Sequence, residues 1–209
     1  MIEVVLIVSL AVIFVIILNR VSQISIDPVD QNLALETYAV ANSLKSKEIS
    51  NFGNIDRLEN HINKLLSQAE KAINTKKYSY AEKILLRVAT LSPKESRSYA
   101  MLGNLYLKQQ NYKDAIPALK ETIKYNQKDA AVYLDLATAY YNLKNFGDAI
   151  KYFKKSIYIE PSIAHKYISL ASAYELNHQK QKAIHVAKKA VDLEPENIAY
   201  QKILKELEK

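Results

Sequence analysis

The chain has 209 residues, no cysteine, three glycines and five prolines, and its formal net charge is +7 at pH 7. The absence of cysteine excludes disulfides, thiolate metal sites and cysteine nucleophiles. So few glycines and prolines, without a long alternation of apolar and polar residues, indicate an almost wholly helical chain.

The first predicted element is a membrane-spanning anchor, residues 1–20. The segment 2–18 is apolar except for Glu3 and Ser9, and Arg20 follows shortly after it. A helix of that length reaches about 25 Å, close to the ~30 Å hydrocarbon core of a bilayer, and Glu3 and Arg20 can lie at the two interfaces. We therefore expect a single-pass membrane protein.

A cleavable secretory signal is the main alternative for this segment. It is disfavoured because no basic residue precedes the apolar run, Glu3 lies near its start, and no Ala-x-Ala-like site occurs before Val21 or Gln23. The basic residues also predict an orientation. None precedes the run and Arg20 follows it, so the positive-inside tendency favours a cytoplasmic location for the rest of the chain.

Residues 21–54 are predicted to be a polar linker that contains one helix. Asp27-Pro28 can start this helix, because proline is tolerated in a first turn. Its apolar face would consist of Leu33, Leu35, Tyr38, Val40, Ala41 and Leu44. A coiled-coil contact with a second copy is left open, but too few heptads are present to indicate a homo-oligomer.

Residues 55–209 form the next predicted domain, in which residue types recur at one constant interval along the sequence. Alanine falls at Ala81, Ala115, Ala149 and Ala183, and tyrosine at Tyr106, Tyr140 and Tyr174. A fixed period means a repeated structural unit. Apolar residues follow helical spacing in two runs per period, so each unit is expected to be a pair of amphipathic helices.

The period divides this domain into four units and a terminal helix. The units are 62–95, 96–129, 130–163 and 164–197. Small residues let the two helices of a unit approach closely; in the first helix they are Ala69, Gly103, Ala137 and Ala171. Residues 198–209 carry Ile203, Leu204 and Leu207 on one face, as expected for a solubilising cap helix.

The units carry the pattern of a known repeat. In the third unit it reads Tyr133, Leu136, Ala137, Tyr140, Ala149, Phe153 and Pro161. This order of aromatic, leucine, small residue, tyrosine, alanine, large apolar residue and proline resembles the tetratricopeptide repeat (TPR). The resemblance implies an all-α fold, a right-handed superhelical solenoid of four TPR helix pairs with a C-terminal capping helix. The apolar run of residues 2–18 adds one transmembrane helix before this solenoid.

The resemblance also implies a concave face, lined mainly by the first helix of each unit, that binds a peptide or protein. The family's groove positions correspond here to Arg97, Asn104, Leu107, Lys108, Leu134, Thr138, Tyr141, Asn142, Ile168, Ser172 and Glu175. Tyr141, Leu107 and Arg97 are the expected hot spots. Family members that bind acidic chaperone tails clamp carboxylates with basic and amide side chains. Because Ala100 and Asp135 stand at clamp positions, we do not expect such a client.

No residue pattern indicates catalysis, and neither a cofactor nor a metal is expected. The four histidines are His61, His165, His178 and His185. They share no i, i+4 spacing and have no cysteine nearby, unlike the ligands of zinc sites. Gly-x-Gly-x-x-Gly, Gly-Lys-Ser/Thr and Gly-x-Ser-x-Gly motifs are missing. The chain is therefore predicted not to be an enzyme.

The net positive charge has two interpretations. Lysines are interleaved with acidic residues, as in Lys113-Asp114 and Lys120-Glu121, and there is no arginine-rich tract. This pattern is typical of a solvated helix surface, and nucleic acid is not the expected partner. The alternative is an acidic protein, a lipid headgroup or a nucleic acid bound through the lysines, with a steep dependence on salt.

Together these features predict a membrane-anchored adaptor that binds a peptide or protein client in the concave groove. Anchoring the groove would raise the local concentration of the client near other membrane components. The alternative is a structural subunit of a larger envelope, pilus or secretion assembly, in which the convex face and the linker make the contacts.

Overall fold

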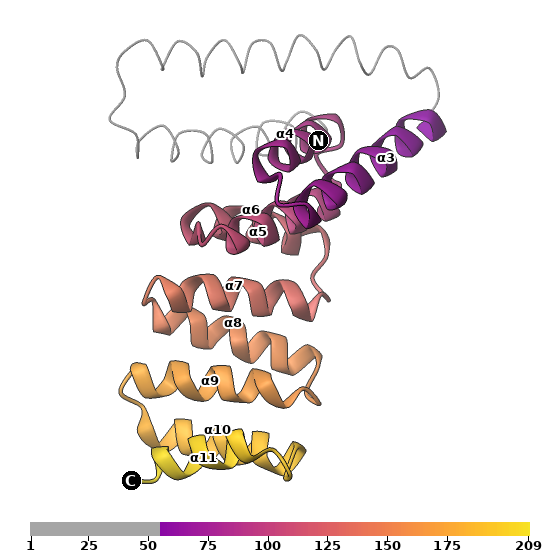
Figure 1. Ribbon diagram of the computed structural model, residues 1–209. Helices are drawn as coiled ribbons and strands as arrows, with labels where there is room; N and C mark the ends of the chain where they lie inside the picture. Colours follow the sequence, from indigo (N-terminus) through magenta and orange to yellow (C-terminus); the bar gives the residue numbers. More distant parts are fainter. Residues whose placement is uncertain (1–54) are drawn as a thin grey trace, which may run out of the picture. The chain divides into compact units, whose positions relative to one another are not determined.

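The computed structural model describes residues 55–209, and every regular element in that range is an α-helix (Figure 1). The all-α prediction is therefore confirmed for this range. Within it, no helix is both long and apolar enough to cross a bilayer. The predicted anchor, residues 1–20, and the predicted linker, residues 21–54, lie outside the described residues.

The chain divides after Gln109 into two compact units. The described part of unit 1 holds α3 (Ile55–Asn74), α4 (Tyr78–Leu91) and α5 (Ser96–Lys108). Unit 2 holds α6 (Tyr112–Tyr125), α7 (Ala130–Asn142), α8 (Phe146–Ile159), α9 (Ala164–Leu176), α10 (Lys180–Leu193) and α11 (Ile198–Leu207). Helices α7 and α9 start at residues 130 and 164, and α8 and α10 start at residues 146 and 180. Both pairs of starts are as far apart as Ala149 and Ala183, which mark the repeat in the sequence. The period found in the sequence is thus the period of the helices.

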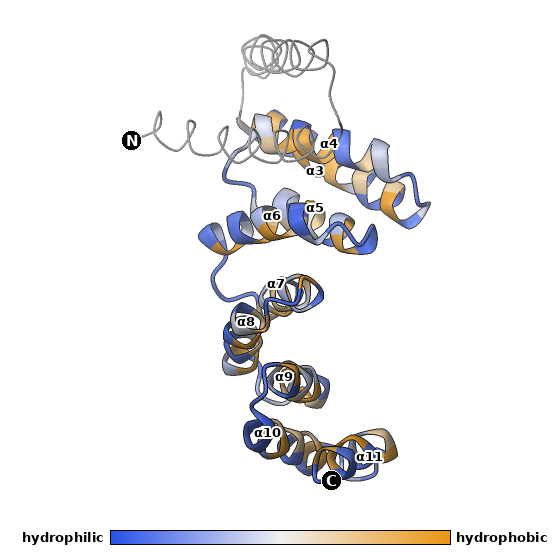
Figure 2. Ribbon diagram, turned by 90° about the vertical axis from the view of Figure 1, so that its left-hand side faces the viewer, coloured by the Kyte–Doolittle hydropathy of each residue, from blue (hydrophilic) through white to orange (hydrophobic). Residues whose placement is uncertain are grey.

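Unit 2 has two sides. In Figure 2, α7, α9 and α11 lie on one side of this unit, and α6, α8 and α10 lie on the other. Consecutive helices pack against each other along the unit. The two sides therefore present different surfaces, one made by first helices of the repeats and one made by second helices.

Local signals fix where the helices of unit 2 begin. The Asp129 side chain accepts hydrogen bonds from the backbone N–H groups of Ala131 (3.1 Å) and Val132 (3.3 Å) at the start of α7. Asn145 accepts from the N–H of Asp148 (3.3 Å) at the start of α8. Both residues satisfy N–H groups that have no partner inside the helix, which is why aspartate and asparagine are favoured there.

Small residues bring the two helices of a repeat together. The side chains of Ala137 on α7, Ala149 on α8, Ala171 on α9 and Ala183 on α10 are fully buried. Ser156 of α8 also donates a hydrogen bond of 2.7 Å to the carbonyl oxygen of Ala130 on α7. At these positions a larger side chain would have no space, because protein interiors are close-packed.

The last helix covers an apolar cluster. Ala171, Ala183, Ala187 and Leu207 are buried together, and Ile203 and Leu204 of α11 pack against them. The apolar face seen in the sequence of 198–209 is therefore the face that α11 turns inward, while Lys202, Lys205 and Glu206 are exposed.

The first repeat departs from this packing in unit 1. Tyr106 is fully buried on α5, whereas the residue one period earlier is Ala72 on α3. A hollow of about 290 Å³ lies beside Ala72, and Tyr80, at 56% exposure, lines it. The degenerate repeat therefore has a small residue beside this hollow, where the next repeat has a buried tyrosine.

The turns that join the two helices of a repeat contain non-glycine residues in the left-handed conformation. Lys144 has a φ of 60°, and Lys76 and His178 have a φ of 58°. After α7, the N–H of Lys144 bonds to the carbonyl of Tyr141 and the N–H of Asn145 bonds to the carbonyl of Tyr140, both at 2.9 Å. This is the Schellman arrangement that usually places glycine at the left-handed position.

Replacing Lys144 by glycine is therefore expected to stabilise the domain by about 0.5–1 kcal/mol. Glycine has no Cβ and adopts this backbone conformation without the steric cost that other residues bear. The same substitution at Lys154, which is exposed inside α8, should destabilise the domain by a similar amount, because glycine is a poor helix former. Chemical denaturation of both variants measures this; a loss of stability in Lys144→Gly would contradict it.

Candidate binding site

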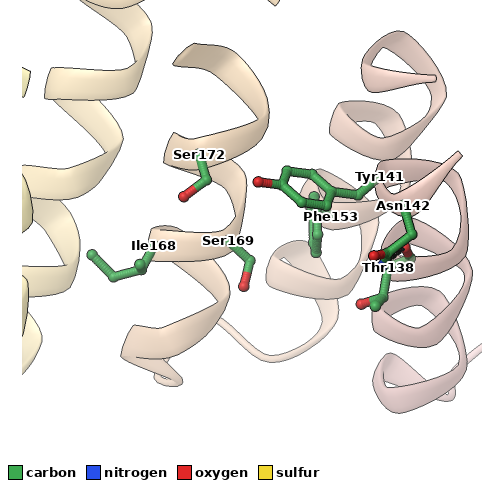
Figure 3. A pocket seen from close by; sticks show the side chains of 7 residues that line it. All are labelled: Thr138, Tyr141, Asn142, Phe153, Ile168, Ser169 and Ser172. Atoms are coloured by element: carbon green, nitrogen blue, oxygen red, sulfur yellow. Dashed lines mark hydrogen bonds between the residues drawn. The ribbon is translucent and has the colours of Figure 1, made fainter. Parts of the chain in front are cut away.

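One pocket of unit 2 lies between α7 and α9. Its volume is about 280 Å³, and it is lined by Thr138, Tyr141, Asn142, Phe153, Ile168, Ser169 and Ser172 (Figure 3). Phe153 comes from α8, whereas the other lining residues come from the two first helices. The pocket therefore opens on the side of unit 2 that first helices make.

The apolar part of the pocket is an aromatic group with fixed geometry. The Tyr141 ring meets the ring of Phe146 edge to face, with centroids 5.7 Å apart, and that of Phe153 in the same way at 6.5 Å. Contacts of this kind contribute about 0.5–1.5 kcal/mol each beyond their buried area. Phe153 is only 3% exposed, so these contacts hold Tyr141 against a rigid base.

The polar groups of the pocket differ in whether they already have partners. Thr138 donates to the carbonyl of Leu134 (2.9 Å), and Asn142 donates through its amide to the carbonyl of Thr138 (2.8 Å). The hydroxyls of Tyr141 and Ser172 make no hydrogen bond with any residue in 55–209, and Figure 3 shows the Tyr141 hydroxyl directed toward Ser172. These two groups are available to a ligand.

Asp135 lies one turn before Thr138 on α7 and is half-buried. Burial, with a smaller contribution from the charge of Asp129, raises the pKa of its carboxyl to about 6. Its side chain makes no hydrogen bond or ion pair with the described residues. Above that pH, Asp135 is therefore an unpaired negative charge beside the first-helix face.

The predicted groove residues of unit 1 are arranged differently. Arg97, an expected hot spot, donates from Nε and Nη2 to the two carboxylate oxygens of Glu95, both at 2.8 Å, and from Nη2 to Asn63 at 2.9 Å. The hydrogen bond from Arg97 is the main reason that the pKa of Glu95 is lowered. The guanidinium thus already has a carboxylate partner. On α5, Asn104 and Lys108 are exposed and Leu107 is half-buried.

The structure brings together only part of the predicted set. Thr138, Tyr141, Asn142, Ile168 and Ser172 surround the pocket, whereas Leu134 and Glu175 do not line it. Sequence reasoning did not place Phe153 or Ser169 in the groove; it named Phe153 only as the large apolar residue of the repeat pattern. The signal for Ser169 was available, because it lies one period after Asp135, which was named as a clamp position of the family. Peptide binding by these residues stays a prediction.

Comparisons with known proteins follow the helix pattern. Sequence models of the tetratricopeptide repeat match residues 100–162 and 165–197. This chain contains tetratricopeptide repeats. Among curated protein sequences, no similar protein was found. Within residues 55–209, no group of His, Asp or Glu side chains is suited to hold a metal ion.

Solved structures of MamA share the TPR fold. A structure called MamA AMB-1 is 25% identical with a TM-score of 0.61, over 64% of this chain and 73% of that chain. A crystal structure of MamA is 23% identical with a TM-score of 0.62, over 85% of this chain and all of that chain. The segment from residue 41 to the end of MamA from Desulfovibrio magneticus RS-1 is 18% identical with a TM-score of 0.62, over 77% and 96% of the two chains. The TM-scores show a common fold.

Proposed function

We propose that this chain is a membrane-anchored adaptor whose TPR pocket binds a segment of a protein client. The observation that carries the proposal is the pocket between α7 and α9, in which the ring of Tyr141 is held by Phe146 and Phe153 and the hydroxyls of Tyr141 and Ser172 have no partner in residues 55–209. Aromatic anchors in desolvated pockets dominate the energy of protein interfaces. The free hydroxyls supply the hydrogen bonds that an extended peptide backbone needs.

The size and charge of the pocket restrict the client. Pockets for whole small molecules usually measure about 300–1,000 Å³. A pocket of about 280 Å³ that is open on the first-helix face fits one large apolar side chain of a peptide better than a separate cofactor. Asp135 is close to this face and disfavours an acidic segment, so we expect a neutral or basic one.

Residues 1–20 supply the anchor in this proposal. Their apolar run, between Glu3 and Arg20, is the sequence feature that supports it. Arg20 also supports a cytoplasmic location for the TPR domain. Anchoring would concentrate the client at the membrane surface without adding a contact to the pocket itself.

Loss of the Tyr141 ring is expected to weaken client binding by about 30-fold, the equivalent of about 2 kcal/mol. The full chain is placed in neutral nanodiscs and used to select binding peptides from a random library. Calorimetry then gives the dissociation constant of a selected peptide for the unmodified chain and for Tyr141→Ala. Tyr158→Ala is the matched control, because Tyr158 is 81% exposed on α8 and does not line the pocket.

Equal affinities for Tyr141→Ala and the unmodified chain would show that the pocket does not bind the peptide. The structural-subunit alternative makes the opposite prediction. It requires that substitutions in the linker, residues 21–54, abolish assembly while substitutions in the pocket have no effect.

A further inference from the structure

A column of lysines runs along the second helices of unit 2. Lys120 on α6, Lys154 on α8 and Lys188 on α10 are all exposed and occupy the same position of three successive repeats. Successive repeats therefore place them at matching positions of the second helices α6, α8 and α10, which in Figure 2 lie on the other side of the unit from α7 and α9. We call this side the lysine face.

The lysine face carries most of the positive charge of unit 2. Helices α6 and α8 each contain three lysines and α10 contains four. They contain two, one and one acidic residues, respectively, and two of those, Asp114 and Glu121, are buried. By contrast, α7 contains no lysine, and the one lysine of α9, Lys166, is buried in an ion pair with Glu160.

Aromatic rings hold several of these lysines without neutralising them. Lys120 lies 5.6 Å from the centre of the Tyr140 ring, and Lys151 lies 5.4 Å from that of Tyr152. Lys155 lies 5.3 Å from the centre of the Tyr158 ring. Such cation–π contacts orient the ammonium groups and leave their charge in place.

Ion pairs reduce the charge of the second helices at two ends of the unit. On α6, Lys124 pairs with Glu121 at 2.9 Å. On α10, Lys188 pairs with Glu208 at 3.1 Å, and both side chains are about half exposed. Between them, Lys154 on α8 makes no hydrogen bond or ion pair with residues 55–209. None of the three lysines of α8 forms an ion pair within residues 55–209, so ion pairing does not reduce the charge of this helix.

Two further acidic side chains lie on these helices. Asp148, in the first turn of α8, is half-buried and accepts a hydrogen bond of 2.8 Å from the amide of Asn145. Asp192 on α10 is exposed. Because the lysines of the three helices outnumber these acids, the lysine face stays positive.

We propose that the lysine face docks on the anionic headgroups of a lipid bilayer. The charge is spread over three helices and does not converge on a buried polar group, so it matches a diffuse negative surface and not a single bound anion. Tyr158 stands exposed on the same stretch of α8 as Lys151, Lys154 and Lys155. Tyrosine is favoured at the level of the headgroups because its ring is apolar and its hydroxyl is polar.

Two further arguments favour lipid over nucleic acid. Unit 2 contains no arginine, which is the residue best suited to bidentate recognition of phosphates. The proposed anchor, residues 1–20, would also hold the face close to a bilayer, and in this respect the inference rests on the proposed function. Docking through the second helices would leave α7 and α9, which supply most of the residues that line the pocket, on the side of unit 2 away from the membrane.

Lysine reactivity in the full chain tests the proposal. The chain is reconstituted into nanodiscs of neutral lipid or of lipid with about 30% phosphatidylserine, and acetylation of each lysine is followed by mass spectrometry. Near an anionic membrane each lysine contributes about a fivefold gain in binding. We therefore expect Lys120, Lys151, Lys154 and Lys155 to react at least about fivefold more slowly in the anionic discs. The exposed turn residue Lys144 should react equally in both.

Two variations make the outcome decisive. High salt should restore the reactivity of Lys120 in the anionic discs, because salt screens the attraction to the headgroups. The triple substitution of Lys151, Lys154 and Lys155 by glutamine should restore it as well. The thermal unfolding midpoint of this variant shows whether it folds.

Equal reactivity of the lysines in neutral and anionic discs overturns the proposal, as does protection of Lys144 equal to that of the lysine face. Stronger protection by added duplex DNA in neutral discs would assign the face to nucleic acid instead. Failure of the chain to enter neutral discs would count against the anchor, not against docking.

Discussion

Replacing Asp135 by asparagine is expected to stabilise the TPR domain at pH 8 by about 1 kcal/mol or slightly more, and to have almost no effect near pH 4. Burial raises the pKa of this carboxyl from 3.8 to about 6, and the charge of Asp129 adds to the shift. A shift of one pKa unit corresponds to about 1.4 kcal/mol. We take less than the full value because part of the side chain is exposed to screening solvent.

The sign of the effect follows from proton binding. Between pH 4 and pH 6 the folded state holds a proton on Asp135 that the unfolded state has lost, so the free energy of unfolding falls as the pH rises through this range. Above about pH 7 both states are ionised and the penalty is constant. Asparagine has no charge at any pH, so the variant does not lose the unfolding free energy that ionisation of the half-buried Asp135 carboxyl costs.

Urea denaturation of the two proteins at several pH values measures the difference. Other carboxyl groups titrate in both proteins and cancel in the comparison. Asp192→Asn is the matched control, because Asp192 is exposed on α10 and a surface substitution usually changes stability by less than about 0.5 kcal/mol. A destabilised Asp135→Asn variant at pH 8 would mean that the carboxylate has a cationic partner in the folded chain.

Enlarging Ala149 to leucine is expected to cost about 2–3 kcal/mol. Ala149 is fully buried on α8, in the pair that α8 forms with α7, and Ala137 on α7 is fully buried as well. Extra methylenes in such a site force side chains off their rotamers or move the two helices apart. The thermal midpoint and the denaturant midpoint should both fall.

The same change at Ala131 isolates the effect of burial. Ala131 is exposed in the first turn of α7, so Ala131→Leu places its added atoms in solvent and should leave stability nearly unchanged. If the two substitutions had equal effects, the small residues at this position of the repeat would not determine how closely the helices pack.

The helices could be predicted from the sequence because the repeat supplies the same evidence several times. The residue types of Tyr133, Tyr140 and Ala149 recur at the same positions of neighbouring repeats. All three side chains are buried, as the pattern indicates. A buried position that recurs once per unit leaves little choice of helix boundary. The left-handed residue Lys144 was not predictable, because glycine, the usual signal for that conformation, is absent.

The sequence predicted those residues of the site whose place on the first-helix face follows from their position in the repeat alone. The register identified Tyr141, Ile168 and Ser172, which surround the pocket. It could not show that Phe153, a core position, also reaches the pocket, or that Arg97 is already bound by Glu95. It also treated lysines as solvated, whereas Lys166 is 3% exposed and paired with Glu160. Each of these facts depends on the conformation of particular side chains, which the repeat register does not specify.

The structure of the full chain with a library-selected peptide tests the central claim most directly. We predict that an apolar side chain of the peptide lies against Tyr141 and Ile168 and that the hydroxyl of Ser172 or Tyr141 bonds to the peptide backbone. A peptide bound to α8 and α10 on the lysine face, without contact to Tyr141, would contradict the account.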